Sequence, residues 1–164
     1  MRGKVIREMF DCVPEIEFES GYRYFLGNMN NYTRALMSTL KSVKSKLPIL
    51  HTMNLSDEFE GLRTIAQTLR KMMGNIGATG IAESTYQLEL AVLNEDVVYL
   101  QEQLPGYIVS LINLSDHLES LLKNIDIKNN MNAEEEQSSF LNYDFTKTKE
   151  SIKLSTDLLG RKII

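Results

Sequence analysis

Apolar residues recur along this chain at intervals of three and four positions, the spacing that places side chains on one face of an α-helix. No stretch shows the sustained two-residue alternation of a half-buried β-strand. The pattern therefore predicts an all-α protein. Two short helices are expected first: one ends before Pro14, and one covers Phe18–Phe25 and ends near Gly27 and Asn28.

Four longer apolar stripes follow these short helices. Helices of this length with short connections, such as the one expected at Asn94–Asp96, favour antiparallel neighbours. We therefore expect an up-and-down four-helix bundle. Pro48 predicts a kink or a break, Pro105–Gly106 predicts a kink, and Ser56 and Asp57 are candidate helix caps. The stripes cover residues 32–50, 59–76, 81–92 and 97–125.

The composition changes near the C-terminus. Large apolar residues nearly vanish at 128–139, where turn-forming and charged residues dominate. We therefore expect a bundle over residues 1–126, a polar connection over 127–139 and an amphipathic C-terminal helix over 140–164.

The start of that last helix has its own signal, because Asn132 with Glu135 three positions later resembles a capping box, which indicates a beginning near Ala133. Leu141 and Phe145 are among the apolar residues on its face. Three arrangements are open: the helix packs back on the bundle, pairs with a second copy in a homodimer, or projects into solvent.

Composition and charge exclude several function classes. The chain has 164 residues, 43% hydrophobic and 24% charged, which suits a folded domain. A net charge of −4 supplies no basic field for nucleic acid. No apolar run approaches the roughly 20 residues of a membrane span, and charges interrupt the first ten residues where a secretion signal would be apolar. We expect a cytoplasmic protein with neither nucleic-acid nor membrane partners.

Metal and covalent chemistry have little support in the sequence. Cys12 is the one cysteine, so the chain cannot form an internal disulfide. His51 and His117 are the only histidines, and they form no cluster with metal-ligand spacing or with a catalytic serine. We therefore predict no metal, no cofactor and no enzymatic activity.

The clearest functional signal lies in the helix expected over 59–76. At about 100° per residue, Gln67 falls roughly 150° from the centre of the apolar stripe and should face water. Arg63, Arg70 and Lys71 surround it. The segment after it contains Gly74 and Gly77, and we expect these glycines to end the helix and turn the chain, with the intervening isoleucine beneath the turn.

The segment QTLRKMMGNIGA, residues 67–78, resembles the hallmark of the histidine-containing phosphotransfer (HPt) family, which reads His-Thr-Leu-Lys-Gly-Ser-Ala-Gly-Asn-Ile-Gly-Ala. FESGYRYFLGN with Tyr32 resembles the family's opening helix, and QLE at 87–89 resembles its Leu-Glu signature. The resemblance covers about residues 17–122. It implies a four-helix bundle; in the family, an exposed histidine passes a phosphoryl group between aspartates of receiver domains.

The chain departs from the family where the chemistry happens. Gln67 stands in place of the histidine, and its amide nitrogen is neither a nucleophile nor a base at neutral pH. Arg70 replaces a lysine and keeps the charge, whereas Lys71 replaces a glycine and would partly cover the position. The resemblance therefore implies a pseudo-HPt protein of a two-component phosphorelay, which binds a response-regulator receiver domain or a histidine kinase without accepting phosphate. The partner-binding residues so implied are Glu60, Arg63, Gln67, Arg70, Lys71 and Gly74.

Other interpretations of the same residues stay open. The face around Gln67 could be an ordinary solvated helix surface with Glu60 as an ion-pair partner. The chain could be a structural or assembly module that acts through its C-terminal helix. It could also be a phosphotransfer protein that uses another residue, although neither His51 nor His117 matches the motif position.

Overall fold

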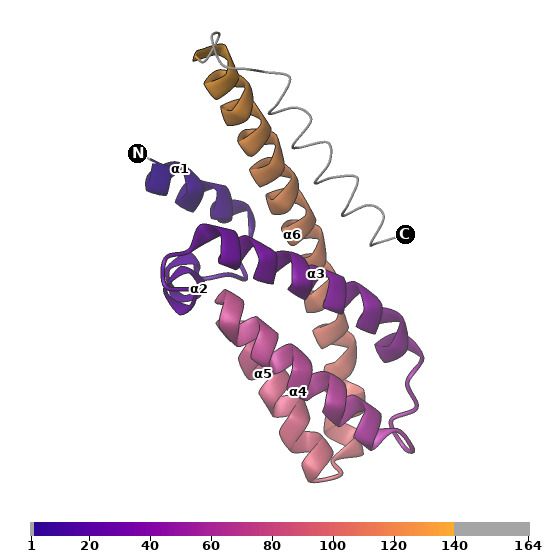
Figure 1. The fold of residues 1–164 in the computed structure, drawn as a ribbon. Coiled ribbons are helices and arrows are strands. Elements are labelled where there is room, and N and C mark those ends of the chain that lie inside the picture. The colour runs from indigo at the N-terminus through magenta and orange to yellow at the C-terminus, as the bar shows by residue number, and fades with distance from the viewer. Residues whose placement is uncertain (1, 140–164) are drawn as a thin grey trace. The chain divides into compact units, whose positions relative to one another are not determined.

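The computed structural model describes residues 2–139 (Figure 1). Within these residues every regular element is a helix, which confirms the predicted all-α class. In chain order the elements are α1 (Arg2–Met9), the 3-10 helix η1 (Phe10–Cys12), α2 (Phe18–Tyr24), α3 (Met29–Thr52), α4 (Phe59–Ile76), α5 (Thr79–Leu93) and α6 (Val97–Ser139).

The chain divides into two compact units, residues 1–126 and 127–164. The first unit holds α1 to α5 and the larger part of α6. Of the second unit, the structure describes residues 127–139, which continue α6. The C-terminal helix that we expected over 140–164 lies outside the described residues.

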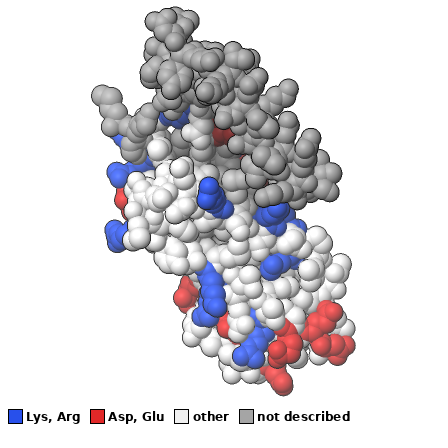
Figure 2. Space-filling view, in the orientation of Figure 1, with Lys and Arg blue, Asp and Glu red and all other residues white. Residues whose placement is uncertain are grey.

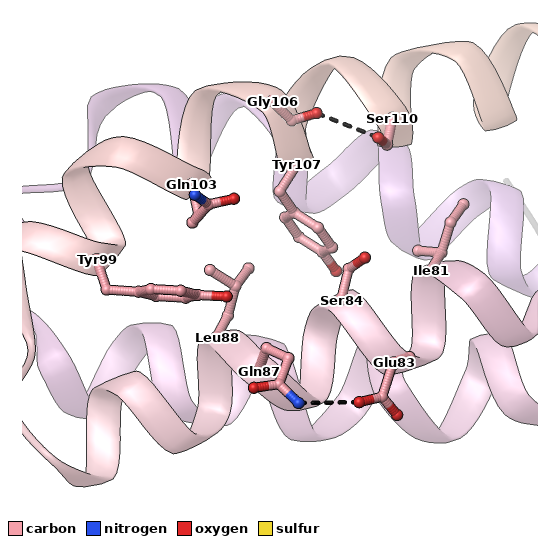
Figure 3. Close-up of a pocket in the computed structure, with 10 residues that line it drawn as sticks. All are labelled: Ile81, Glu83, Ser84, Gln87, Leu88, Tyr99, Gln103, Gly106, Tyr107 and Ser110. Atoms are coloured by element: carbon pink, nitrogen blue, oxygen red, sulfur yellow. Dashed lines mark hydrogen bonds between the residues drawn. The ribbon is translucent and has the colours of Figure 1, made fainter.

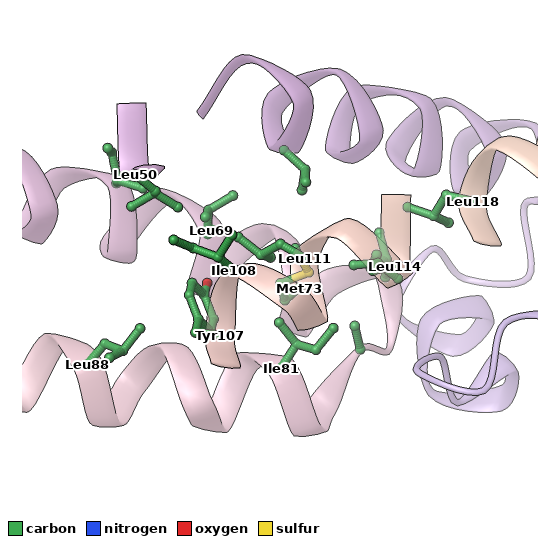
Figure 4. Packing of buried hydrophobic residues seen from close by; sticks show 14 of the residues in the cluster. Leu50, Leu69, Met73, Ile81, Leu88, Tyr107, Ile108, Leu111, Leu114 and Leu118 are labelled. Atoms are coloured by element: carbon green, nitrogen blue, oxygen red, sulfur yellow. The ribbon is translucent and has the colours of Figure 1, made fainter. Parts of the chain in front are cut away.

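One apolar core in the first unit draws side chains from α3, α4, α5 and α6 (Figure 4). Helix α4 packs against both α3 and α5. Each buried leucine stabilises the fold by about 1.5–3 kcal/mol, so this core is a major source of stability. The largest fully buried side chains are Tyr32, Leu36 and Leu50 of α3, Leu62, Leu69, Met73 and Ile76 of α4, and Leu100, Leu111, Leu114, Leu118 and Leu121 of α6.

Helix α4 ends at Ile76 in a left-handed turn. Gly77 has a φ of 91°, and the N–H of Ala78 donates to the carbonyl of Met73 at 2.8 Å. This is the Schellman arrangement, which favours glycine because a Cβ disfavours left-handed angles. Ile76 is fully buried, as expected. Gly74, which we expected to share in ending the helix, instead lies exposed inside α4.

The end of α4 is held by α2 and α3. The backbone N–H of Glu17 donates to the carbonyl of Gly77 at 2.9 Å, and the hydroxyl of Tyr32 donates to the carbonyl of Ile76 at 2.6 Å. Burial raises the pKa of Tyr32 well above its usual value, so the phenol stays a neutral donor. A Cβ at Gly21 would collide with the carbonyl of Ile76 and the ring of Tyr32. Glycine at this position therefore permits α2 to approach α4 closely.

The predicted caps of α4 were wrong. Ser56 and Asp57 lie in a turn, whereas α4 begins at Phe59 with Glu58 in the capping position and no side-chain cap. Asn54 organises this turn instead, because its Oδ1 accepts from the N–H of Ser56 at 3.0 Å. The N–H of Asn54 donates to the carboxylate of Glu58 at 2.7 Å. This bond engages the Glu58 carboxylate, the side-chain group that could otherwise have capped α4.

Neither proline breaks its helix. Pro48 lies inside α3, one turn before its end, and Pro105 lies inside α6. Each proline removes one N–H from the helical ladder. The tight connection expected between α5 and α6 is confirmed at Asn94–Asp96, where Glu95 adopts a φ of 52°.

We expected residues 127–139 to be a polar connection between two helices, but these residues are themselves helical. Helix α6 continues through Ser139, so Asn132 lies inside a helix and not at the start of one. The physical reason is that no proline or glycine occurs between residues 107 and 159, and that Ala133 to Gln137 are good helix formers. A loss of apolar residues therefore indicates that burial changes along the chain. It does not indicate that the helix ends, because a polar segment can stay helical.

Candidate functional site

The candidate site is the outward face of α4. Apart from the adjacent Arg70 and Lys71, its members follow one another at intervals of three and four residues, opposite the buried stripe that includes Leu62, Leu69 and Met73. Gln67 lies on this outward side and is partly buried, less exposed than we expected. The amide offers a hydrogen-bond donor and an acceptor, and no group able to attack phosphorus. The predicted members of this face are Glu60, Arg63, Gln67, Arg70, Lys71 and Gly74.

Arg63 is loosely held one turn before Gln67. Its Nη1 lies 3.8 Å from Oε1 of Glu60, at the outer limit of an ion pair. The buried Nε of Arg63 has no hydrogen-bond partner among the described residues. An exposed pair of this kind contributes at most about 1 kcal/mol. The structure thus brings Glu60 and Arg63 together without fixing them strongly.

Arg70 turns away from Gln67 toward α5. Its Nε lies 3.1 Å from Oε2 of Glu89, and its guanidinium lies over the ring of Tyr86 at 5.3 Å from the centroid. The side chain of Glu89 is only 9% exposed, and its Oε2 accepts no aligned hydrogen bond within residues 2–139. Arg70 therefore compensates a buried carboxylate, which gives it a structural role that we did not expect.

Lys71 and Gly74 occupy the exposed side of the same helix. Lys71 forms no ion pair in the part of the chain that the structure describes. Nothing lies within 4 Å of a Cβ built on Gly74, so this stretch of the surface is open. Thr68, next to Gln67, is exposed and donates its hydroxyl to the carbonyl of Thr64 at 3.0 Å.

Sequence reasoning missed the role of α5 in this site. Glu89 belongs to the QLE segment, whose Leu88 is buried in the core. Helices α4 and α5 lie on either side of Gly77, but Arg70 is seven residues before this glycine and Glu89 is twelve residues after it. Equal spacing about the turn therefore would not have indicated this pair.

The two histidines lie on other elements. His51 is exposed in the last turn of α3. His117 of α6 has its Nδ1 at 2.7 and 2.9 Å from the two carboxylate oxygens of Glu15, a contact that sequence spacing could not indicate across 102 residues. The described residues contain no group of three or more side chains placed to hold a metal ion.

On the face drawn in Figure 2, Lys and Arg side chains are scattered, and several Asp and Glu side chains gather toward its lower end. Among residues 2–139, no helix is both long and apolar enough to cross a membrane. No protein-family model, curated protein or solved structure matches the chain.

Proposed function

We propose that this chain is a pseudo-phosphotransfer protein of a two-component phosphorelay. In this proposal α3, α4, α5 and α6 form an HPt-like four-helix bundle that binds a receiver domain or a histidine kinase without accepting phosphate. The observation that carries it is the position of Gln67, on the outward side of α4 and in register with a motif that has histidine there.

The contacts within the first unit support this proposal. The opening segment and the QLE segment of the family resemblance each contact the hallmark segment: Glu17 bonds to Gly77, Tyr32 bonds to Ile76, and Glu89 pairs with an arginine of α4. Segments far apart in sequence thus hold the C-terminal half of α4 in place.

In this proposal the protein acts by occupying the binding surface of a receiver domain. A receiver domain has an acidic rim around its phosphorylation pocket, so a basic, open helix face offers it complementary charge. Lys71 is exposed and forms no ion pair with a described residue, so it can approach such a rim, whereas Arg70 pairs with Glu89. Because Gln67 cannot accept a phosphoryl group, the bound receiver domain keeps its phosphoryl group. While it is bound, the receiver domain is also unable to bind other partners.

Binding to receiver domains from the same host tests the proposal. We expect Lys71→Glu to weaken binding about five- to tenfold at low salt, since a rim charge acts mainly on association. Lys123→Glu, a matched change at an exposed lysine of α6, should leave affinity unchanged. Calorimetry or interferometry at two salt concentrations measures both. Equal effects of the two changes, or no receiver or kinase that binds, would count against the proposal.

A structural or assembly function is the second candidate, and one observation favours it. Ile127 and Met131, four residues apart on α6, are 54% and 58% exposed. An apolar pair on an exposed helix face suits self-association. Light scattering over a concentration series, with wild type and an Ile127→Glu/Met131→Glu variant, tests it. A concentration-dependent dimer that the double change dissolves would favour assembly over receiver binding.

A further inference from the structure

A pocket lies between α5 and α6, away from the outward face of α4 (Figure 3). Its volume is about 290 Å³, near the lower end for small-molecule sites. Leu88 and Ile81 of α5 supply its apolar floor, and Tyr107 of α6 reaches toward α5. The pocket is independent of the function proposed above.

One wall of the pocket is fixed by a buried hydrogen bond. The hydroxyl of Tyr107 lies 2.7 Å from Oγ1 of Thr85, and the Thr85 hydroxyl lies 2.6 Å from the carbonyl of Ile81. Burial raises the pKa of Tyr107 to about 12, so the phenol stays neutral. A wall held in this way is preformed, which lowers the conformational cost of binding.

The other lining groups have free hydrogen-bonding capacity. Tyr99 and Gln103 of α6 make no side-chain hydrogen bond to any described residue, and the Tyr99 ring extends from α6 toward α5 in Figure 3. Across from them, Glu83 accepts from the amide of Gln87 at 2.9 Å. Among the described residues that line the pocket, Glu83 is the only charged one, because none of them is a lysine, arginine or histidine.

This combination selects a class of ligand. A carboxylate without a neighbouring cation repels anions and attracts cations, and the faces of tyrosine rings attract cations as well. An apolar floor favours a short hydrocarbon or aromatic body. We propose that this pocket binds a small organic cation, a protonated amine that carries such a body, with its ammonium group at Glu83 and its body against Tyr99 and Leu88.

Three probes of similar size separate charge from shape: 2-phenylethylammonium, the neutral 2-phenylethanol and the anion phenylacetate. Each is titrated into the full-length protein while backbone amide NMR shifts are recorded. We expect the amine to bind with a dissociation constant on the order of 1 mM, as befits so small a ligand. Its shifts should centre on the lining residues of α5 and α6, and the alcohol and the anion should bind more weakly, in that order.

Two changes in the protein test the assignment of roles. Glu83→Gln keeps the hydrogen bond to Gln87 and removes only the charge, so it should weaken amine binding about threefold and leave alcohol binding unchanged. Tyr99→Leu should weaken amine binding about two- to fivefold. Glu102→Gln, a matched change at an exposed glutamate outside the lining, should have no effect.

Three results would overturn the proposal. One is the absence of shifts in the pocket at about ten times the expected dissociation constant. Another is equal binding of the alcohol and the amine. The third is an amine affinity that Glu83→Gln and Glu102→Gln change equally.

Discussion

Helix α4 has two parts that its surroundings hold very differently. Its C-terminal end, residues 73–78, is fixed by hydrogen bonds from α2 and α3 and by a left-handed glycine. In its outward middle, residues 60–71, Arg70 pairs with Glu89 of α5, but the rest has a 3.8 Å ion pair, a partly buried glutamine and an exposed lysine. Folding accounts for the residues at the end, whereas the middle leaves Gln67 and Lys71 available to a partner.

The largest effect is expected at the fixed end. Gly77→Ala forces an alanine into left-handed angles, and its Cβ would collide with the carbonyl of Glu17. Strain and overpacking together should cost about 3 kcal/mol or more. Thermal unfolding should show a Tm lower by roughly 6–12 °C for a chain of this size. An unchanged Tm would mean that this turn does not require glycine at position 77.

The buried hydroxyl of Tyr32 should matter next. Tyr32→Phe leaves the carbonyl of Ile76 without its donor inside the core, at a cost of about 1–3 kcal/mol. Tyr24→Phe is the matched control, because Tyr24 is 57% exposed. Urea unfolding of both variants measures the difference. Equal midpoints would show that the hydrogen bond contributes nothing to holding α3 against α4.

A third pair of changes compares Arg70, which pairs with Glu89, with Lys71, which forms no ion pair with a described residue. Arg70→Ala removes the charge that compensates Glu89, so it should destabilise the fold by about 1–2 kcal/mol. Lys71→Ala should stay within about 0.5 kcal/mol of wild type, as surface changes usually do. The same urea experiment distinguishes them. A Lys71 variant as unstable as the Arg70 variant would contradict the division of roles.

The smallest effect has the opposite sign. Gly74→Ala fills open space within a helix, where alanine is favoured over glycine, and should stabilise the protein by about 0.5–1 kcal/mol. The same substitution thus should stabilise α4 at 74 and destabilise it at 77. Destabilisation at both positions would indicate a close contact at Gly74 that the structure does not have.

Helical periodicity predicted the fold class because the core takes its side chains from one stripe on each long helix. Leu62, Leu69 and Met73 were placed on the buried side of α4 by spacing alone, and all three are buried. Helix boundaries that depend on the hydrogen bonds of a turn were harder to predict. Asn54 displaced Ser56 and Asp57 as the organiser of the turn before α4, a competition between neighbouring hydrogen-bonding residues that a pattern does not resolve.

The candidate site was predicted in part. Spacing put Gln67 and Lys71 on the outward side of α4; in the structure Lys71 is exposed, whereas Gln67 is partly buried. Arg70 has the same spacing, yet it pairs with Glu89 and stacks on Tyr86. Periodicity within one helix does not indicate what the neighbouring helix offers. The contact of Glu15 with a histidine of α6 was missed for the same reason.

Phosphoryl transfer tests the central claim most directly. The full-length protein is incubated with radiolabelled, phosphorylated receiver domains that it binds, and acid-labile label on the chain is measured over time. We predict a stable complex with no label on the wild-type chain, because Gln67 offers no ring nitrogen to attack phosphorus. Label on the wild-type chain would contradict the claim. Loss of that label in His117→Ala or His51→Ala would then identify the residue that carries the phosphate.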